Sequence, residues 1–155
     1  METNRSSPTQ VPVADAVPFR AAGLDHIVLR VRDLERMLAF YTRVLGCILE
    51  RERPDLALFQ LRAGHCLIDL VTIDGELGRA GGAGPGEQGR NLDHFCLGVS
   101  PFDDAAIRRH LAAHGVQIGT TAVRYGAGGH GPSIYLRDPE GNGIELKESA
   151  HDGTS

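Results

Sequence analysis

The sequence predicts an α+β fold built from two tandem βαβββ modules. The main observation is an internal repeat, since LDHIVL at residues 24–29 returns as LDHFCL at residues 92–97. Each copy is followed by a short loop, a helical segment, a glycine and strand-like runs. A glycine-rich stretch of residues 75–91 separates the two copies. An internal repeat reports directly on architecture, so we expect one module for each copy.

The two expected helices are marked by their ends. Asp33 is a suitable N-cap for a helix over residues 33–45, whose apolar residues recur at helical spacing and which Gly46 terminates. The second helix is expected from Asp103 or Asp104 to His114, just before Gly115. The remaining apolar runs predict strands over residues 24–31, 48–53, 56–61, 65–72, 92–99, 116–123, 132–137 and 143–148. A turn with the sequence DPEGNG is expected to join the last two as a hairpin.

Composition excludes several classes of protein. The chain has 155 residues, the size of one ordinary domain, and its net charge of −4 with scattered basic residues argues against nucleic acid as a partner. No apolar run approaches the roughly 20 residues of a membrane span, so no membrane partner is expected. Three cysteines without a CxxC pair argue against a disulfide framework and a cysteine-rich zinc site. We therefore expect reduced thiols in a cytoplasmic protein.

The expected domain organisation follows from the repeat and from two polar ends. Residues 1–22 and 150–155 are expected to form flexible tails around one domain, residues 23–149. Within that domain, module one spans residues 23–74, the glycine-rich linker residues 75–91, and module two residues 92–149.

Alternation along the strands places four polar residues on faces away from the helices. His26 and His94 occupy equivalent positions at the first strand of each half, and Asp69 and Glu145 lie on the last strand of each half. Two imidazoles with one or two carboxylates suit a first-row divalent metal such as Mn, Fe, Co, Ni or Zn. The alternative is that each is an ordinary polar residue of a cleft wall.

Other polar residues are candidates for substrate binding. Arg30 shares a face with His26, and Tyr135 shares a face with Arg137, so these three are candidates to hold a polar or anionic group. His130 lies between glycines and is a candidate to close over a substrate. A solvated strand face or loop is the alternative for each. We interpret the pair His110 and His114 on the second helix as solvated surface.

Together the motifs LDHIVL, FYTRVLG, LIDLV, LDHFCL and YLRDPEGNGIEL resemble the vicinal oxygen chelate superfamily of glyoxalases, bleomycin resistance proteins and ring-cleaving dioxygenases. The resemblance covers about residues 23–148, and the chain is most similar to small, single-pair glyoxalase-like proteins. It implies a cupped, barrel-like mixed sheet around a central cleft, in which a substrate chelates a metal through neighbouring oxygens. Carried over by position, the metal ligands fall on His26, Asp69, His94 and Glu145.

The resemblance implies a metal-dependent glyoxalase-like enzyme, a lyase or isomerase, acting on a small substrate with adjacent oxygens. It implies one divalent transition metal ion per site, with Glu145 as ligand and general base and Asp69 as ligand or second acid–base group. Glyoxalases usually carry Glu where this chain has Asp69. Without Asp69, the remaining two histidines and one carboxylate form the pattern of Fe(II) oxygenases, so a ring-cleaving dioxygenase is one alternative. A small-molecule or drug-sequestering protein without catalysis is the other.

We expect a homodimer, and the linker is long enough for the four ligands to come from one chain or from two. The sequence leaves these two arrangements open.

Overall fold

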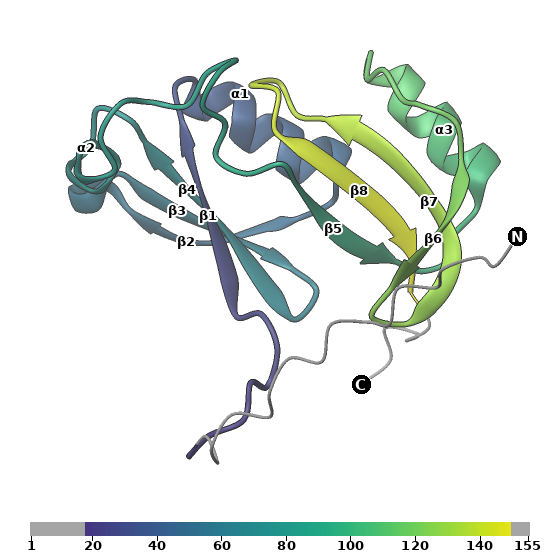
Figure 1. Ribbon diagram of the computed structural model, residues 1–155. Helices are drawn as coiled ribbons and strands as arrows, with labels where there is room; N and C mark the ends of the chain where they lie inside the picture. The colour runs from purple at the N-terminus through teal and green to yellow at the C-terminus, as the bar shows by residue number, and fades with distance from the viewer. Residues whose placement is uncertain (1–17, 150–155) are drawn as a thin grey trace, which may run out of the picture.

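Figure 1 presents a computed structural model of the protein, which describes residues 18–149. The chain forms two four-stranded sheets with the strand orders β1-β4-β3-β2 and β5-β8-β7-β6. In each sheet the first strand of the module pairs in parallel with the last, and the other pairs are antiparallel. The α+β prediction of two βαβββ modules is therefore confirmed. The sheets are cupped, and they stay two separate sheets in place of one closed barrel.

The elements follow one another in the same order in both modules. The first module contains β1 (His26–Val31), α1 (Leu34–Ala39), a π-helical turn (Phe40–Val44), β2 (Ile48–Arg53), a 3₁₀ turn (Pro54–Leu56), β3 (Leu58–Ala63) and β4 (Cys66–Thr72). The short helix α2 (Glu76–Ala80) follows in the glycine-rich stretch, where only a loop was expected. The second module contains β5 (His94–Val99), α3 (Asp104–Ala113), β6 (Ala122–Gly126), β7 (Gly129–Arg137) and β8 (Gly143–Glu148). In Figure 1 the two sheets lie side by side, with α1 behind them near the middle.

Both helix starts are confirmed by their caps. The Asp33 carboxylate accepts the backbone N–H of Arg36 at 3.0 Å, and that of Asp103 accepts the N–H of Ala106 at 2.9 Å. The first helix is not uniform, because it continues beyond α1 as the π-helical turn. It ends before Gly46, whose φ of 71° lies in the left-handed region that favours glycine.

Loss of the second cap has a moderate expected effect. Replacement of Asp103 by Ala leaves an N–H of the first turn of α3 without its acceptor and is expected to lower the free energy of unfolding by about 1 kcal/mol. Asp103→Asn keeps an acceptor oxygen and is expected to lose much less. Urea denaturation of both variants measures the difference. Equal losses in the two variants would show that the cap bond is not the cause.

Three strand predictions need correction. The strand expected over residues 116–123 is wrong, because β6 starts only at Ala122, and Ile118 makes just an isolated bridge to Leu136. Val116 and Ile118 pack singly against the core, so their apolar character does not reflect a strand. The strand expected from residue 56 starts later, because the 3₁₀ turn and the left-handed residue Ala57 precede it. The strand expected from residue 132 starts at Gly129, because β6 and β7 pair as far as Gly126 and Gly129. The tail predictions for residues 1–17 and 150–155 lie outside the described residues.

One core joins the two modules. Leu29, Ile68 and Tyr41 of the first module belong to the same buried cluster as Ile144 and Leu146 of the second. This cluster lies on the faces of the strands that carry the alternate, apolar residues. The opposite faces of both sheets carry the histidines and carboxylates singled out from the sequence.

The DPEGNG turn of the second module binds the first helix of the chain. The Tyr41 hydroxyl donates to the Asp138 carboxylate at 2.8 Å, and both residues are buried. Burial, and then the charge of Asp138, raise the pKa of Tyr41 far above its usual value, so the hydroxyl stays a donor. Glu140 accepts the backbone N–H groups of Arg32 and Asp33. The turn therefore fixes module two against the start and middle of the first helix.

Within residues 18–149, no helix is long and apolar enough to cross a membrane.

Candidate metal centre

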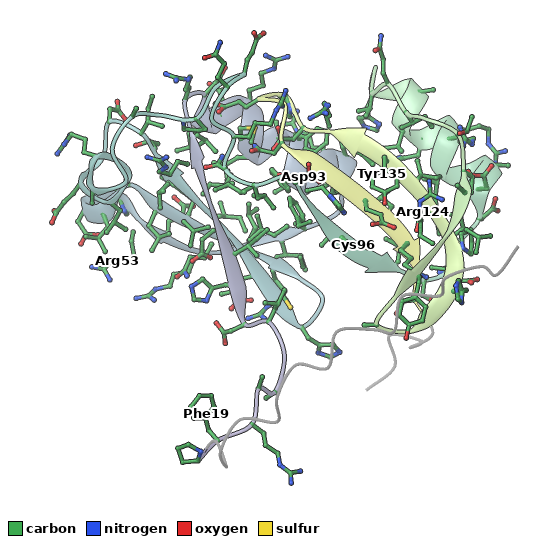
Figure 2. The ribbon with its side chains drawn as sticks, viewed as in Figure 1. Phe19, Arg53, Asp93, Cys96, Arg124 and Tyr135 are labelled. Carbon is green, nitrogen blue, oxygen red and sulfur yellow. The ribbon has the colours of Figure 1, made fainter. Side chains whose placement is uncertain are left out.

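Each sheet has one face opposite the core, which we call its cup face. On the first sheet, the cup face carries His26, Val28, Asp69 and Gln60, since Val28 pairs with Asp69 and Asp69 pairs with Gln60. On the second sheet, it carries His94, Cys96, Glu145 and Tyr135, since Cys96 pairs with Glu145 and Glu145 with Tyr135. Figure 2 shows Cys96 and Tyr135 over the strands of the second sheet. The faces predicted from strand alternation are thus the faces observed.

His94 and Glu145 form a half-site on the second cup face. The His94 Nε2 atom lies 3.5 Å from Glu145 Oε2. One ion bound at about 2.0–2.2 Å from each donor spans such a separation. The other carboxylate oxygen, Glu145 Oε1, is buried and has no hydrogen-bond partner among the described residues. A buried, unpaired carboxylate oxygen is unfavourable unless a cation or donor completes its shell.

His26 and Asp69 form the corresponding half-site on the first cup face. Asp69 is 4% exposed; its Oδ2 accepts the Gln60 side-chain amide at 3.0 Å, and its Oδ1 has no partner in the part of the chain that the structure describes. The pKa of His26 is raised, chiefly by its hydrogen bond to Asp25, and the charge of Asp69 contributes in the same direction. Asp69 therefore lies near enough to His26 for their charges to interact.

A preceding aspartate orients each histidine in the same way. The Asp25 carboxylate lies 2.7 Å from His26 Nδ1, and the Asp93 carboxylate lies 2.5 Å from His94 Nδ1. Because a carboxylate accepts only, it holds the proton of a neutral imidazole on Nδ1 and leaves the Nε2 lone pair free. Carboxylate–histidine pairs of this kind typically support metal-ligating histidines.

One chain does not bring the two half-sites together. Among residues 18–149, no group of three or more His, Cys, Asp and Glu side chains lies close enough to hold a metal ion. Each half-site offers one imidazole and one carboxylate, which is a suitable but incomplete donor set for a first-row divalent ion. The residues therefore fit a metal only as two halves of one set.

Tyr135, a predicted substrate-binding residue, lies beside the second half-site. Tyr135 lies directly opposite Glu145, with its ring 5.5 Å from that of His94. Partial burial and the Glu145 carboxylate raise the pKa of Tyr135, while Arg124 acts in the opposite direction. Figure 2 shows Tyr135 and Arg124 close together on the second sheet.

The predicted substrate-binding residues Arg30, Arg137 and His130 all have partners within the fold. The Arg30 guanidinium donates to the Gly82 carbonyl, and that of Arg137 to the Gly141 carbonyl. His130 lies in β7, not in a mobile loop as expected, and its ring contacts Tyr125. These contacts hold surrounding loops and strands in place.

His110 is more than the solvated surface residue that the sequence suggests, and Cys96 is an unreactive thiol. His110 Nε2 lies 2.8 Å from the Val44 carbonyl, so this side chain links α3 to the first module as well as facing solvent. Burial, and then the charge of Glu145, raise the pKa of the Cys96 thiol to about 11. The thiol is therefore protonated at neutral pH and is a poor nucleophile.

Three residues of the candidate centre were missed by sequence reasoning. Asp25 and Asp93 stand directly before the two histidines, and the repeat LDH contains both, so the repeat itself carried this signal. Gln60 had no comparable signal. Its contact with Asp69 depends on the register between β3 and β4, which the strand pattern alone does not give.

The sequence matches the Glyoxalase/Bleomycin resistance protein/Dioxygenase superfamily over residues 23–146, and the chain belongs to this family. The resemblance inferred from the motifs is thus confirmed. Members of this superfamily commonly bind a divalent metal, and membership supports a glyoxalase-like or related metalloenzyme family.

Two curated relatives share much of the sequence. The chain is 34% identical over 125 residues to the glyoxalase domain-containing protein RDO1 of Mycosarcoma maydis, an alignment that covers 79% of this chain and 66% of RDO1. It thus spans just under two thirds of that relative. It is 30% identical over 129 residues to the virulence protein STM3117 of Salmonella typhimurium, covering 81% of this chain and 83% of that protein.

Solved structures have the same fold. The crystal structure of STM3117 superposes with a TM-score of 0.71 at 27% identity, covering 85% of this chain and 100% of that one. The integron cassette protein VCH_CASS1 from the mobile metagenome of V. cholerae superposes with a TM-score of 0.67 at 28% identity, covering 85% of this chain and 98% of the other.

Proposed function

We propose that the chain is a metal-dependent, glyoxalase-like enzyme that acts on a small substrate with adjacent oxygens. The observation that carries the proposal is the duplication of one arrangement on both cup faces. Each half-site pairs an aspartate-oriented histidine with a buried carboxylate that has an unpaired oxygen. Two such halves supply two imidazoles and two carboxylates, a donor set that suits Ni, Co, Zn, Mn or Fe.

We further propose that the centre forms between two chains. Since one chain offers only two donors at each half-site, the first half-site of one protomer and the second half-site of its partner would complete the set. A twofold dimer then contains two complete centres. The exposed apolar residues Val28 and Ile48, which lie on the first cup face, favour burial of that face by a partner.

A divalent ion bound at such a centre supplies Lewis-acid polarisation of the substrate's adjacent oxygens. His26 and His94 hold their Nε2 lone pairs in position because Asp25 and Asp93 fix the rings. Glu145 Oε1 would be the base that takes a proton from the substrate carbon bearing the hydroxyl group and returns it to the neighbouring carbon. The hydroxyl proton would pass from one adjacent oxygen to the other in the same reaction, so the proton balance closes. Asp69 completes the donor set or serves as the second acid–base group.

Metal content of freshly purified protein tests the proposal. We expect about one Ni, Co, Zn, Mn or Fe per centre, lost together with turnover in the His26→Ala variant. His65→Ala is the matched control, because that histidine lies in the β3–β4 turn and carries no proposed role. Normal metal content in His26→Ala would overturn the proposal. Iron with oxygen uptake would favour the dioxygenase alternative, and ligand binding without any metal uptake would favour the binding protein.

Gln60 is expected to influence metal affinity without touching the ion. Gln60→Leu removes the amide that holds Asp69 Oδ2, so the carboxylate loses its orientation and metal affinity is expected to fall about tenfold. Titration with the metal after chelator treatment measures the change. Gln88→Leu, an exposed glutamine of the linker, is the control. Unchanged affinity in Gln60→Leu would mean that Asp69 does not depend on this bond.

A further inference from the structure

A lysine is buried on the second cup face without a partner for its charge. Lys147 is only 7% exposed, although it lies on β8 two residues beyond Glu145. Among the described residues, no ion pair or hydrogen bond to its ammonium group is formed. The Lys147 ammonium nitrogen is not one of the fully buried polar atoms, so the residue buries its apolar stem and brings its charge to the surface of the cup face, where a ligand can reach it.

Two glycines make room for this side chain. A Cβ atom at Gly126 would lie 2.9 Å from Lys147 Cε, and one at Gly131 would lie 2.9 Å from Lys147 Nζ. The lysine thus extends from β8 across β7 toward β6, past two positions where any larger residue would collide with it. The Glu148 carboxylate lies beside the same strand, since its Oε2 would be 3.2 Å from a Cβ at Gly131. Gly131 shares the cup face with Tyr135, because both follow the same alternation along β7. The ammonium group therefore lies on the cup face.

Two further hydrogen-bond donors, Ser133 and Arg124, lie on the same face as Lys147. Ser133 is directly opposite Lys147 in the β7–β8 register; it is fully buried, and its Oγ has no hydrogen-bond partner among residues 18–149. Arg124 pairs with Gly131 in the β6–β7 register, so its exposed guanidinium belongs to the same face. Two cations and an unsatisfied hydroxyl gathered on one face match an oxyanion in charge and in hydrogen-bonding capacity.

We propose that Lys147, Ser133 and Arg124 form an oxyanion-binding subsite that takes a carboxylate or phosphate group of the substrate. The Cα atoms of Lys147 and Glu145 are separated by two residues of strand, or roughly 6–7 Å. The substrate is then a small organic anion, with its adjacent oxygens at the metal centre and its acidic group at the subsite. That assignment to the substrate rests on the proposed function, whereas the subsite itself needs no metal.

Titration with inorganic phosphate, and separately with acetate, tests the subsite in the full chain after chelator treatment. We expect binding of at least one of them, with affinity about tenfold or more weaker in Lys147→Met and clearly weaker in Ser133→Ala. Arg109→Met, an exposed arginine of α3, is the control and should bind as the unsubstituted chain does. Preference for phosphate or for acetate identifies the acidic group.

Thermal denaturation without any ligand separates a binding role from a structural one. Lys147→Met keeps the buried apolar stem and removes only the charge at its end, so its melting temperature should stay the same or rise. A lower melting temperature, no binding of either anion, or undiminished binding in Lys147→Met would overturn the proposal. Metal uptake without anion binding would overturn the subsite alone, and anion binding without metal uptake would overturn the proposed function alone.

Discussion

Mixed dimers of two inactive variants should regain activity. His26→Ala removes a ligand from the first half-site and His94→Ala removes one from the second, so each variant alone is expected to lose turnover by at least about 100-fold. If each centre combines the first half-site of one chain with the second of the other, a mixed dimer contains one intact centre and one that lacks both histidines. About half of randomly paired dimers are mixed, so about a quarter of the original activity should return to the unseparated mixture and about half to the isolated mixed dimers.

The experiment needs co-expression of the two variants with different affinity tags, followed by assays of turnover and metal content of the doubly tagged species. A mixture of His26→Ala with Asp69→Ala is the matched control, because both changes affect the first half-site and no intact centre can form. Recovery in the first mixture and none in the control would fit only a centre shared by two chains. If doubly tagged dimers form but neither mixture regains activity, the whole centre lies within one chain. That result would contradict the proposed assembly.

The face of each strand could be predicted from the sequence because alternation is a local property. Leu29 and Val31 are fully buried, whereas His26 lies on the opposite face, as their parity along β1 requires. The caps at Asp33 and Asp103 were predictable for a similar reason, since a capping carboxylate acts within one turn. Local chemistry therefore determined which side chains reach the two cup faces.

Contacts that depend on long-range register could not be predicted. Gln60 meets Asp69 only because β3 pairs with β4 in one particular alignment, and Lys147 lies over Gly131 only because β7 pairs with β8 in one particular alignment. A bulge between Leu49 and Arg51 shifts the alignment of β2 as well, and nothing in the sequence marks it. The separation of the four predicted ligands into two half-sites has the same origin, because it depends on how whole sheets are placed.

Asp138→Ala is expected to be among the most destabilising single substitutions in the chain. Its buried carboxylate accepts four donors: the Tyr41 hydroxyl at 2.8 Å, the backbone N–H groups of Glu140 and Asn142 at 2.9 Å each, and the Asn142 side-chain amide at 2.7 Å. Alanine leaves these groups without their acceptor at a position that is only 5% exposed. We expect a loss of about 3–5 kcal/mol in the free energy of unfolding, measured by urea denaturation.

Combining Asp138→Ala with Tyr41→Phe in a double-mutant cycle tests this expectation more strictly. Tyr41→Phe alone should lose only about 1–2 kcal/mol, because Asp138 keeps its three other donors. In the Asp138→Ala background, however, Tyr41→Phe should lose almost nothing further, or even restore some stability, since it removes a buried donor that has no acceptor. Asp55→Ala is the control, because that exposed aspartate forms a surface ion pair with Arg53 and should change stability by no more than about 0.5–1 kcal/mol.

Additive losses from Tyr41→Phe and Asp138→Ala would contradict this account, because they would mean that the hydroxyl and the carboxylate stabilise the fold independently.

Coupling between Tyr41 and Asp138 has a consequence for the cup faces. Tyr41 belongs to the first module and Asp138 to the second, so their bond holds the two sheets in one relative placement. Asp138→Ala should then weaken metal binding even at temperatures where both modules remain folded, whereas Asp55→Ala should not.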